Sequence, residues 1–500
     1  MRIALALLSG LITSLAFPSW AFNSLDTRIG ILAWVALVPL LHATSLVSRR
    51  RAFLLGWLAG FAFFASTLYW IACIREMEFM ALPAWLACAA FLGLFWGVWG
   101  WGVSIAGGRA WLAGPALWVL LEWVRGHLFT GFPWAVLGTT QWAFQPVFLS
   151  ARFTGVMGVS FGIVAVNIAV WKFQRREMFR VPAIVLAIFS MGALTILSYS
   201  ARLSINSDTI GKPAVRMALL QGNFTEAEKW ALPMEVMVER YVDLALQAGK
   251  SKAKVTLWPE TATAGELSQD LVTSAKLAKL ARNSRSVQVV GAILRENGHY
   301  YNAAYVVEAN GVEAPFRKTH LVPFGEYIPG FVRAMLPFAR KLTEGVTDYT
   351  PGESMNPGMT GPVRSGVQVC YESIFPDIAR YQSRQGAEVF INLTNDAWYL
   401  RTAATYQHAL GPIARSVECG RWMVRCANTG LSFFCSPAGH PHSTIALFET
   451  GFQAMDIVPV SRITPYARWG DIPLLILALL ALALSYIPAE RLAAPASSRQ

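Results

Sequence analysis

Long windows without charged residues recur in the N-terminal part of the chain and return once near its C-terminus. An α-helix needs about twenty apolar residues to cross a bilayer, where it satisfies its own backbone hydrogen bonds. We therefore predict about eight transmembrane helices, with about seven in residues 1–201 and one in residues 472–489. The predicted windows are Ile3–Leu25, Ile29–Ser48, Ala52–Ile74, Phe79–Gly108, Ala110–Leu121, Gly155–Trp171, Val181–Ala201 and Ile472–Ala489.

The composition of the chain favours a membrane protein over a nucleic-acid-binding protein. Apolar residues make up 54% of the sequence and charged residues 14%, whereas soluble proteins carry about 25% charged residues. The net charge of +12 comes largely from short clusters beside the apolar windows, where basic residues set the orientation of the helices. We therefore expect contact with membrane lipids and no nucleic-acid partner.

The basic clusters predict how the helices are oriented. Arg49–Arg51 and Arg109 follow the second and fourth windows, and Lys172–Arg180 follows the sixth. All these clusters fall on one side of the predicted bundle, which the positive-inside rule assigns to the cytoplasm. Both chain termini and the tail at 490–500 are then cytoplasmic, and residues 202–471 lie on the opposite side. The first window could instead be a cleaved signal peptide, although it leads directly into a second span.

Residues 202–471 have a different pattern, in which short runs rich in β-formers alternate with helical stretches. Helices are predicted at Pro233–Ala248 and at Leu271–Asn283, the latter with helical apolar periodicity. Strands that alternate with helices indicate an α/β layered domain. The predicted strands are Val215–Leu220, Lys254–Leu257, Val287–Leu294, Ala303–Val307, Val367–Val369, Glu388–Leu393, Met423–Ala427 and Ser432–Cys435.

Three short motifs in this domain supply a carboxylate, an amine and a thiol, each at or just after the end of a predicted strand. A neighbouring carboxylate can take the proton of a thiol and later return one to a leaving group. A fixed ammonium stabilises both a thiolate and an oxyanion. We therefore predict Glu260 as general base and acid, Lys318 as electrostatic stabiliser and Cys370 as nucleophile. The motifs are Leu257–Glu260, Arg317–Pro329 and Val369–Glu372.

Each of these residues taken alone also has an ordinary structural role. A glutamate after Trp-Pro usually closes a turn, a lone lysine is usually solvated, and a cysteine that ends an apolar strand is usually a small buried hydrophobe. The six cysteines include no C-x-x-C pair, and no histidine cluster has zinc-ligand spacing, so we expect no metal. The spacing leaves open whether Cys419, Cys426 and Cys435 are bridged.

The order of the three residues at strand ends resembles the nitrilase, or carbon–nitrogen hydrolase, superfamily, which implies an αββα sandwich. The flanking segments resemble the apolipoprotein N-acyltransferase family over essentially the whole chain. The segments that carry this resemblance are Ala16–Pro18, Gly131–Trp134, Gln221–Asn223, Trp258–Glu260, Lys318–Pro329, Cys370–Glu372, Asn395–Trp398 and Asn428–Gly430.

The resemblance implies a two-step reaction that needs no metal or organic cofactor. The Cys370 thiolate takes an acyl chain from a phospholipid, typically phosphatidylethanolamine. It then passes the chain to the α-amino group of the S-diacylglyceryl cysteine of a lipoprotein, the last step of lipoprotein maturation. The resemblance also implies a bacterial inner-membrane enzyme with residues 202–471 in the periplasm, and we expect it to be a monomer.

Further residues are assigned by the resemblance alone. Glu326 matches the second carboxylate of the superfamily, which fixes Lys318 and the neighbouring hydrogen bonds. The apolar segment Phe331–Phe338 is either a mobile lid or part of the core. The positions associated with the pocket, where ordinary packing would also account for the aromatic side chains, are Trp230, Tyr371, Glu372 and Trp398.

Two other classes of protein have to be weighed against this function. A membrane-anchored amidase or nitrilase would use the same three residues, but a single anchoring helix would suffice for it. A non-enzymatic transporter or lipid-binding scaffold would not need an intact set of Glu260, Lys318 and Cys370.

Two charged residues stand at the end of the fifth apolar window, where they are costly unless they are paired or close to water. These residues are Glu122 and Arg125. They are predicted to form either a structural ion pair or a contact with lipid head groups.

Overall fold

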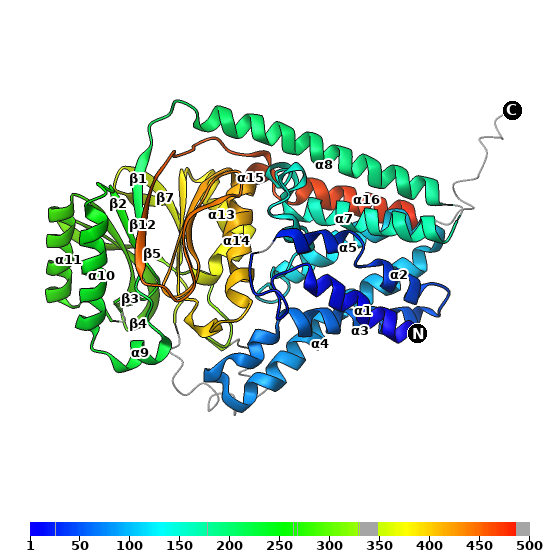
Figure 1. Ribbon diagram of the computed structural model, residues 1–500, viewed down its shortest axis with the longest axis horizontal. Coiled ribbons are helices and arrows are strands. Elements are labelled where there is room, and N and C mark those ends of the chain that lie inside the picture. Colours follow the sequence, from blue (N-terminus) through cyan, green and yellow to red (C-terminus); the bar gives the residue numbers. More distant parts are fainter. Residues whose placement is uncertain are drawn as a thin grey trace. The chain divides into compact units, whose positions relative to one another are not determined.

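The computed structural model describes residues 1–25, 27–177, 179–263, 265–267, 269–328, 330 and 349–486. The chain splits into two compact units (Figure 1). One unit comprises Met1–Tyr199 with Asp471–Gln500, and the other comprises Ser200–Gly470. The predicted lid at 331–338 and the tail at 490–500 lie outside the described residues.

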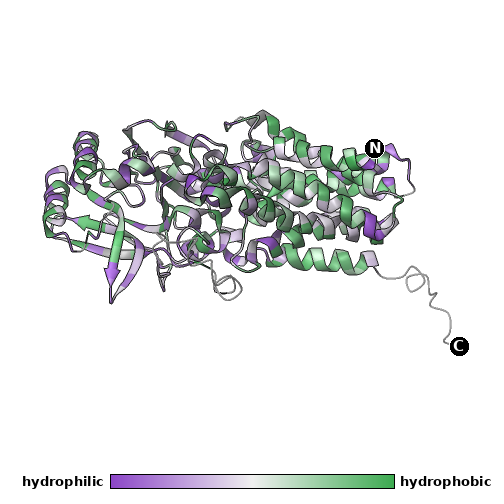
Figure 2. Ribbon diagram, turned by 90° about the horizontal axis from the view of Figure 1, so that it is seen from below, coloured by the Kyte–Doolittle hydropathy of each residue, from purple (hydrophilic) through white to green (hydrophobic). Residues whose placement is uncertain are grey.

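The first unit is built from helices that are predominantly apolar (Figure 2). Among the described residues, three stretches are long and apolar enough to cross a membrane: Met77–His127, Ala151–Gln174 and Arg180–Thr209. The predicted count of about eight spans therefore stays a prediction. The principal helices are α1 (Arg2–Leu15), α2 (Val38–Thr44), α3 (Arg49–Thr67), α4 (Ala81–Ala106), α5 (Ala110–His127), α7 (Ala151–Gln174), α8 (Arg180–Thr209) and α16 (Ile472–Tyr486).

Two predicted windows are not single helices. The window Ile3–Leu25 forms a helix only as far as Leu15, because Pro18 disfavours helical backbone in the residue before it. The window Ile29–Ser48 contains the 3-10 helix Thr27–Trp34 and then α2, with a proline in the first turn of α2. Proline removes a backbone donor from a helix interior but is accommodated at a helix start, so the chain breaks and restarts there.

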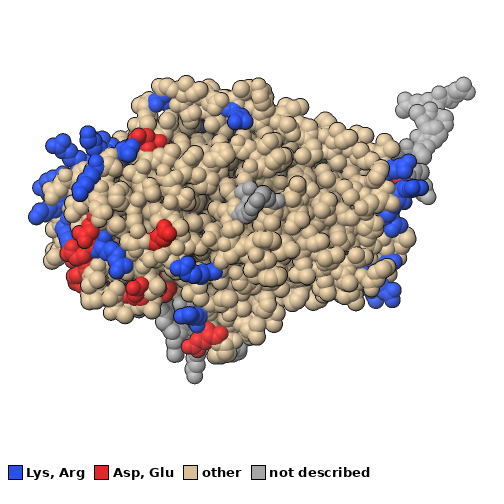
Figure 3. All heavy atoms as spheres, viewed as in Figure 1, with Lys and Arg blue, Asp and Glu red and all other residues tan. Residues whose placement is uncertain are grey.

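The basic loops of this unit meet at one end of its helices. The Arg175 guanidinium donates to the Ser45 hydroxyl (3.0 Å), and the Arg2 guanidinium donates to the Ser45 carbonyl (2.9 Å). Lysine and arginine atoms gather at one end of the helices on the face drawn in Figure 3, and few charged atoms lie along the helix sides there. The N-terminus and the loops before α3 and after α7 therefore share one end of the unit.

Glu122 and Arg125 of α5 are buried and bind backbone groups of the segment that follows α5. Glu122 Oε1 accepts from the N–H of Leu137 (2.8 Å). Arg125 Nη1 donates to the carbonyl oxygens of Phe132 (3.0 Å) and Trp134 (2.5 Å). These contacts give both charged side chains a structural role in holding the segment against α5.

The second unit contains two six-stranded sheets. In the first sheet the order is β12 (Gly451–Ile457), β1 (Val215–Gln221), β2 (Val255–Trp258), β3 (Val287–Glu296), β4 (His299–Glu308) and β5 (Gly311–Arg317). In the second sheet it is β11 (Pro441–Ile445), β10 (Ser432–Cys435), β9 (Trp422–Ala427), β8 (Val389–Thr394), β7 (Val363–Val369) and β6 (Gly358–Thr360). Every strand predicted from the sequence is present.

Alternating side chains divide the core of this unit into layers. In β1, Met217 and Leu219 pack between the sheets, whereas Ala218 and Leu220 face the outer helices, as the two-residue period of a strand requires. Helices α10 (Met234–Gly249) and α11 (Leu271–Ser284), both predicted, cover the first sheet, and α13 (Pro376–Arg384) and α14 (Ala404–Cys419) contact the second (Figure 1). The second unit is therefore an αββα sandwich.

Candidate active site

Glu260 lies in the turn that follows β2 and is 6% exposed. Its Oε1 accepts from Asn302 Nδ2 (2.7 Å), and its Oε2 accepts from the backbone N–H of Asn395 (2.8 Å). The turn packs directly on Gly291 of β3, where an added Cβ would overlap the carbonyl oxygen of Pro259. Both carboxylate oxygens of Glu260 are thus held by donors, and the glycine permits the close approach of the turn.

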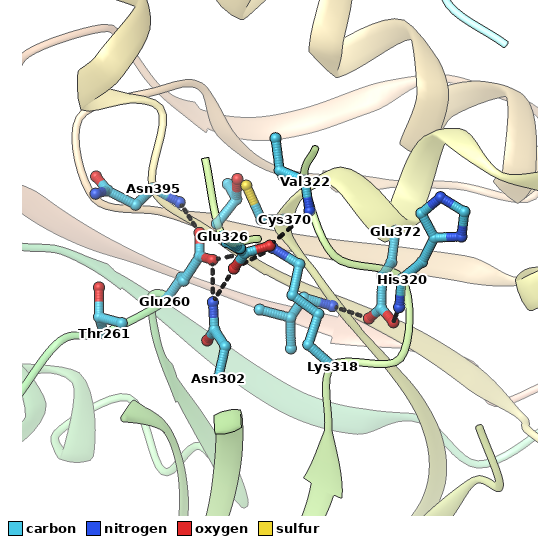
Figure 4. Close-up of polar contacts among 12 residues, drawn as sticks. Glu260, Thr261, Asn302, Lys318, His320, Val322, Glu326, Cys370, Glu372 and Asn395 are labelled. Atoms are coloured by element: carbon cyan, nitrogen blue, oxygen red, sulfur yellow. Dashed lines mark hydrogen bonds and ion pairs between the residues drawn. The ribbon is translucent and has the colours of Figure 1, made fainter. Parts of the chain in front are cut away.

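Lys318 follows β5 directly, and its side chain is 1% exposed. Its Nζ lies 2.8 Å from Glu326 Oε2 and 3.5 Å from Glu260 Oε1. Burial alone would lower the pKa of Lys318, but the charges of Glu326 and Glu260 outweigh it and raise that pKa. The two carboxylates therefore favour the protonated form of the buried Lys318, and Figure 4 shows Lys318 beside Glu326 and Glu260.

Glu326 is the partner that neutralises this ammonium. Its Oε1 accepts from Asn302 Nδ2 (2.9 Å), and its Oε2 accepts from the N–H of Val322 (2.8 Å) in the same loop. The loop therefore fixes the carboxylate, and the carboxylate fixes Lys318. The resemblance implied this contact between Glu326 and Lys318.

Cys370 follows β7 of the second sheet and is the first residue of a 3-10 turn, Cys370–Ile374. Its φ of 54° lies in the left-handed region, which is strained for a residue with a side chain by about 1–3 kcal/mol. Figure 4 shows its sulfur beside the carboxylates and the ammonium of the first sheet. Burial and then the charge of Glu260 raise the pKa of Cys370, and Lys318 opposes them only in part. These surroundings therefore favour the thiol form of Cys370 over the thiolate.

Glu372 links the nucleophile turn to the lysine loop. Its Oε2 accepts from the N–H of Val369 (2.7 Å), next to Cys370. Its Oε1 accepts from the N–H (2.7 Å) and the hydroxyl (2.8 Å) of Thr319, next to Lys318, and from the N–H of His320 (3.1 Å). All four partners are donors, so Glu372 acts as a carboxylate bridge between the two loops.

The aromatic residues assigned by resemblance differ in their surroundings. Tyr371 is buried, with ring centroids 5.1 Å from Phe375 and 6.0 Å from His320. Trp398 is 38% exposed. Trp230 belongs to α9 (Glu226–Ala231), but its side chain lies outside the described part of the chain. Tyr371 therefore packs against His320, in the loop that carries Lys318.

Several residues of the site were missed by the sequence analysis. Asn302 lies in β4 and holds both Glu260 and Glu326, and the N–H of Asn395 holds Glu260. Lys229 of α9 donates to the Thr261 hydroxyl (3.0 Å), and burial lowers the pKa of Lys229. The one signal for Asn302 in the sequence was a polar residue at the edge of an apolar strand.

All six cysteines of the chain are described, and none is bridged. Cys419, Cys426 and Cys435 are buried thiols, which answers the question that their spacing left open. Within the described ranges, no group of three or more His, Cys, Asp or Glu side chains could hold a metal ion.

An acid, an amine and a thiol at strand ends of an αββα sandwich define the carbon–nitrogen hydrolase class, and residues 216–461 match the family described as carbon-nitrogen hydrolase. Residues 9–169 match the apolipoprotein N-acyltransferase N-terminal domain. The apolipoprotein N-acyltransferase of Geobacter metallireducens is 34% identical, with 94% of this chain and 91% of the relative covered. That of Methylococcus capsulatus is 30% identical, with 94% and 92% covered. The chain belongs to the apolipoprotein N-acyltransferase family.

Solved structures with a similar fold match only part of the chain. An amidase from Nesterenkonia sp. is 20% identical with a TM-score of 0.39, covering 51% of this chain and 94% of that one. A carbon-nitrogen hydrolase from Helicobacter pylori G27 is 18% identical with a TM-score of 0.36, covering 49% and 89%.

Proposed function

We propose that this protein is a phospholipid-dependent apolipoprotein N-acyltransferase that works through a thioester on Cys370. The observation that carries the proposal is the buried group formed by Glu260, Lys318 and the Cys370 thiol. A protonated thiol beside a carboxylate has its base at hand, and a paired ammonium lies ready for an oxyanion. The names of the relatives supply the acceptor, an apolipoprotein.

In the first half-reaction Glu260 takes the proton of the Cys370 thiol, and the sulfur attacks an ester carbonyl of a phospholipid. Lys318 stabilises the oxyanion of the tetrahedral intermediate. Collapse breaks the ester C–O bond, and Glu260 returns the proton to the leaving oxygen. The products are a lysophospholipid and an acyl thioester on Cys370.

In the second half-reaction the α-amine of an S-diacylglyceryl cysteine attacks the thioester carbonyl. Glu260 takes a proton from the amine, and the C–S bond breaks as the new amide forms. The departing sulfur of Cys370 recovers that proton. No group besides Glu260, Lys318 and Cys370 is needed for the proton and electron balance.

The membrane setting follows from the lipid substrates and from the charges of the first unit. The proposed donor is a bilayer lipid and the proposed acceptor is a protein that carries a diacylglyceryl group, so apolar helices place the enzyme in the membrane with both substrates. Arg49–Arg51 and Arg176 are exposed near the end that holds the N-terminus, and basic loops stay in the cytoplasm. On this proposal residues 202–471 face the periplasm. Trp230, Tyr371 and Trp398 contribute to the acyl and acceptor pocket.

The test is to weigh the intact protein after incubation in micelles that contain phosphatidylethanolamine. We expect a fatty-acyl adduct that hydroxylamine removes, that Cys370→Ala lacks and that Cys419→Ala, which removes another buried thiol, retains. A diacylglyceryl peptide with a free α-amine should discharge the adduct, and the same peptide with an acetylated amine should not. Discharge by water alone would favour the hydrolase alternative. Absence of any adduct on Cys370 would refute the proposal.

A further inference from the structure

The backbone carbonyl of Cys370 is held by one side chain from β8 and by one from its own 3-10 turn. The carbonyl oxygen of Cys370 accepts from Asn392 Nδ2 (3.2 Å) and from the Ser373 hydroxyl (3.0 Å). Asn392 Nδ2 also donates to the carbonyl of Gln368 (3.1 Å), on the strand that leads into Cys370. Because the direction of this carbonyl is coupled to the left-handed backbone of Cys370, the Asn392 amide helps to define where the thiol points.

Arg425 of β9 orients that amide. Its Nη1 donates to Asn392 Oδ1 (2.5 Å). The guanidinium can only donate, so it fixes the oxygen of the amide on its own side and turns the amide nitrogen toward Cys370. Arg425 is fully buried, and a lysine at this position could not contact two partners in the same plane.

Asp396 holds the other arm of the guanidinium. Arg425 Nη2 lies 2.6 Å from Asp396 Oδ2, and His408 Nδ1 lies 2.9 Å from Asp396 Oδ1. Burial alone would raise the pKa of Asp396, but Arg425 and His408 lower it to about 2. The pair therefore remains charged at any pH at which the protein would work.

The residue before Asp396 holds the catalytic acid. The N–H of Asn395 donates to Glu260 Oε2 (2.8 Å), so the turn anchored by Asp396 also orients Glu260. We propose that Arg425 and Asp396 are positioning residues that hold Cys370, through Asn392, and Glu260, through the Asn395 N–H, in register across the two sheets. This inference rests on the proposed roles of Cys370 and Glu260.

The alternative is that the Arg425–Asp396 pair stabilises the sheet without positioning Cys370 and Glu260. A matched variant at another buried arginine distinguishes these two hypotheses. Arg421, immediately before β9, is also fully buried, and it donates to the carbonyls of Ala387 (2.7 Å) and Arg462 (2.6 Å). We would compare Arg425→Lys with Arg421→Lys in the full-length protein. Melting temperature, the single-turnover rate of Cys370 acylation from phosphatidylethanolamine micelles and the rate of Cys370 alkylation by iodoacetamide would be measured.

Both variants should lower the melting temperature. Only Arg425→Lys should slow acylation, by about tenfold to a hundredfold, and change the pH dependence of Cys370 alkylation. Equal acylation rates and alkylation profiles in the two variants would overturn the inference. The alkylation readout does not require acyl transfer, so this failure is distinguishable from a failure of the proposed function.

A second pair of variants covers the case in which Arg425→Lys does not fold. Asn392→Leu keeps the charged pair and removes the amide that holds the Cys370 carbonyl. Its control is Gln382→Met, because Gln382 donates in the same way to the carbonyl of Val367 on β7 (2.9 Å). Slower acylation in Asn392→Leu alone supports the inference, and equal rates in both overturn it.

Discussion

Lys318 lies closer to Glu326 than to Glu260, although it contacts both carboxylates. Its Nζ lies 2.8 Å from Glu326 Oε2 but 3.5 Å from Glu260 Oε1. On the proposed mechanism, Glu326 neutralises the ammonium and Glu260 exchanges protons with the Cys370 thiol. The two carboxylates still share one donor, Asn302 Nδ2, which keeps them in a fixed relation.

Replacing Glu326 by glutamine should therefore impair catalysis. In Glu326→Gln the ammonium of Lys318 has only Glu260 as a counter-charge and should shift toward it. We expect thioester formation to slow by about a hundredfold, measured by intact mass in single-turnover experiments. Glu296→Gln is the control, because it removes an ion pair with Arg317 that is partly open to solvent. A Glu326→Gln variant that is acylated at the wild-type rate would contradict the pairing described above.

Replacing Glu372 should loosen the link between the nucleophile turn and the lysine loop. The carboxylate of Glu372 accepts four hydrogen bonds from Val369, Thr319 and His320, and a glutamine amide would turn a donor toward some of them. We expect Glu372→Gln to destabilise the protein by roughly 2 kcal/mol or more, seen as a lower melting temperature. Glu388→Gln, which affects one exposed contact to the Arg364 N–H, should melt close to the wild type. Equal melting of the two variants would argue against a bridge.

The reactivity of Cys370 should depend on pH in a way that reflects its surroundings. Burial and Glu260 raise the pKa of Cys370. At a given pH a smaller fraction of Cys370 is therefore thiolate than of an unperturbed cysteine, whose pKa is about 8.5. Alkylation follows the thiolate fraction, so the rate at Cys370 should still be rising above about pH 9. Peptide mass spectrometry would follow Cys370 beside the exposed Cys73. A rate that levels off below neutral pH would mean that the thiolate is stabilised.

Adding a methyl group at Gly291 should displace Glu260 while leaving its carboxylate chemically unchanged. An added Cβ would overlap the carbonyl oxygen of Pro259 and crowd the Cα of Glu260, so Gly291→Ala should displace the turn that carries Glu260. We expect acylation to fall by about tenfold to a hundredfold. Gly311→Ala is the control, because nothing lies within 4 Å of the added atom. If both variants keep the wild-type rate, the turn is less constrained than its packing indicates.

Eight of the twelve strands described in the second unit could be predicted, because the composition of a strand is a property of the local sequence. The short edge strands β6 and β11, and β5 and β12, were not predicted. The catalytic roles of the three motif residues stay a prediction. Asn302, Asn392 and Arg425 could not be assigned a role from the local sequence. Each is a polar residue inside or beside an apolar strand, and its partners come from other strands whose register no short segment encodes. The helices of the first unit were predicted too long where proline interrupts an apolar window, since hydropathy does not register a break in backbone hydrogen bonding.

The three proposed catalytic groups come from opposite sides of the sandwich. Glu260 and Lys318 follow strands of one sheet, and Cys370 follows a strand of the other. On the proposed mechanism, the apolar layer between the sheets, to which Leu257 and Val367 belong, sets the distance over which a proton moves between Glu260 and the sulfur of Cys370. Under that mechanism, we expect the reaction as well as folding to constrain the volumes of these core side chains. A substitution that removes one methyl group from this layer is then expected to change the rate of acylation, although the layer contains none of the proposed reacting groups.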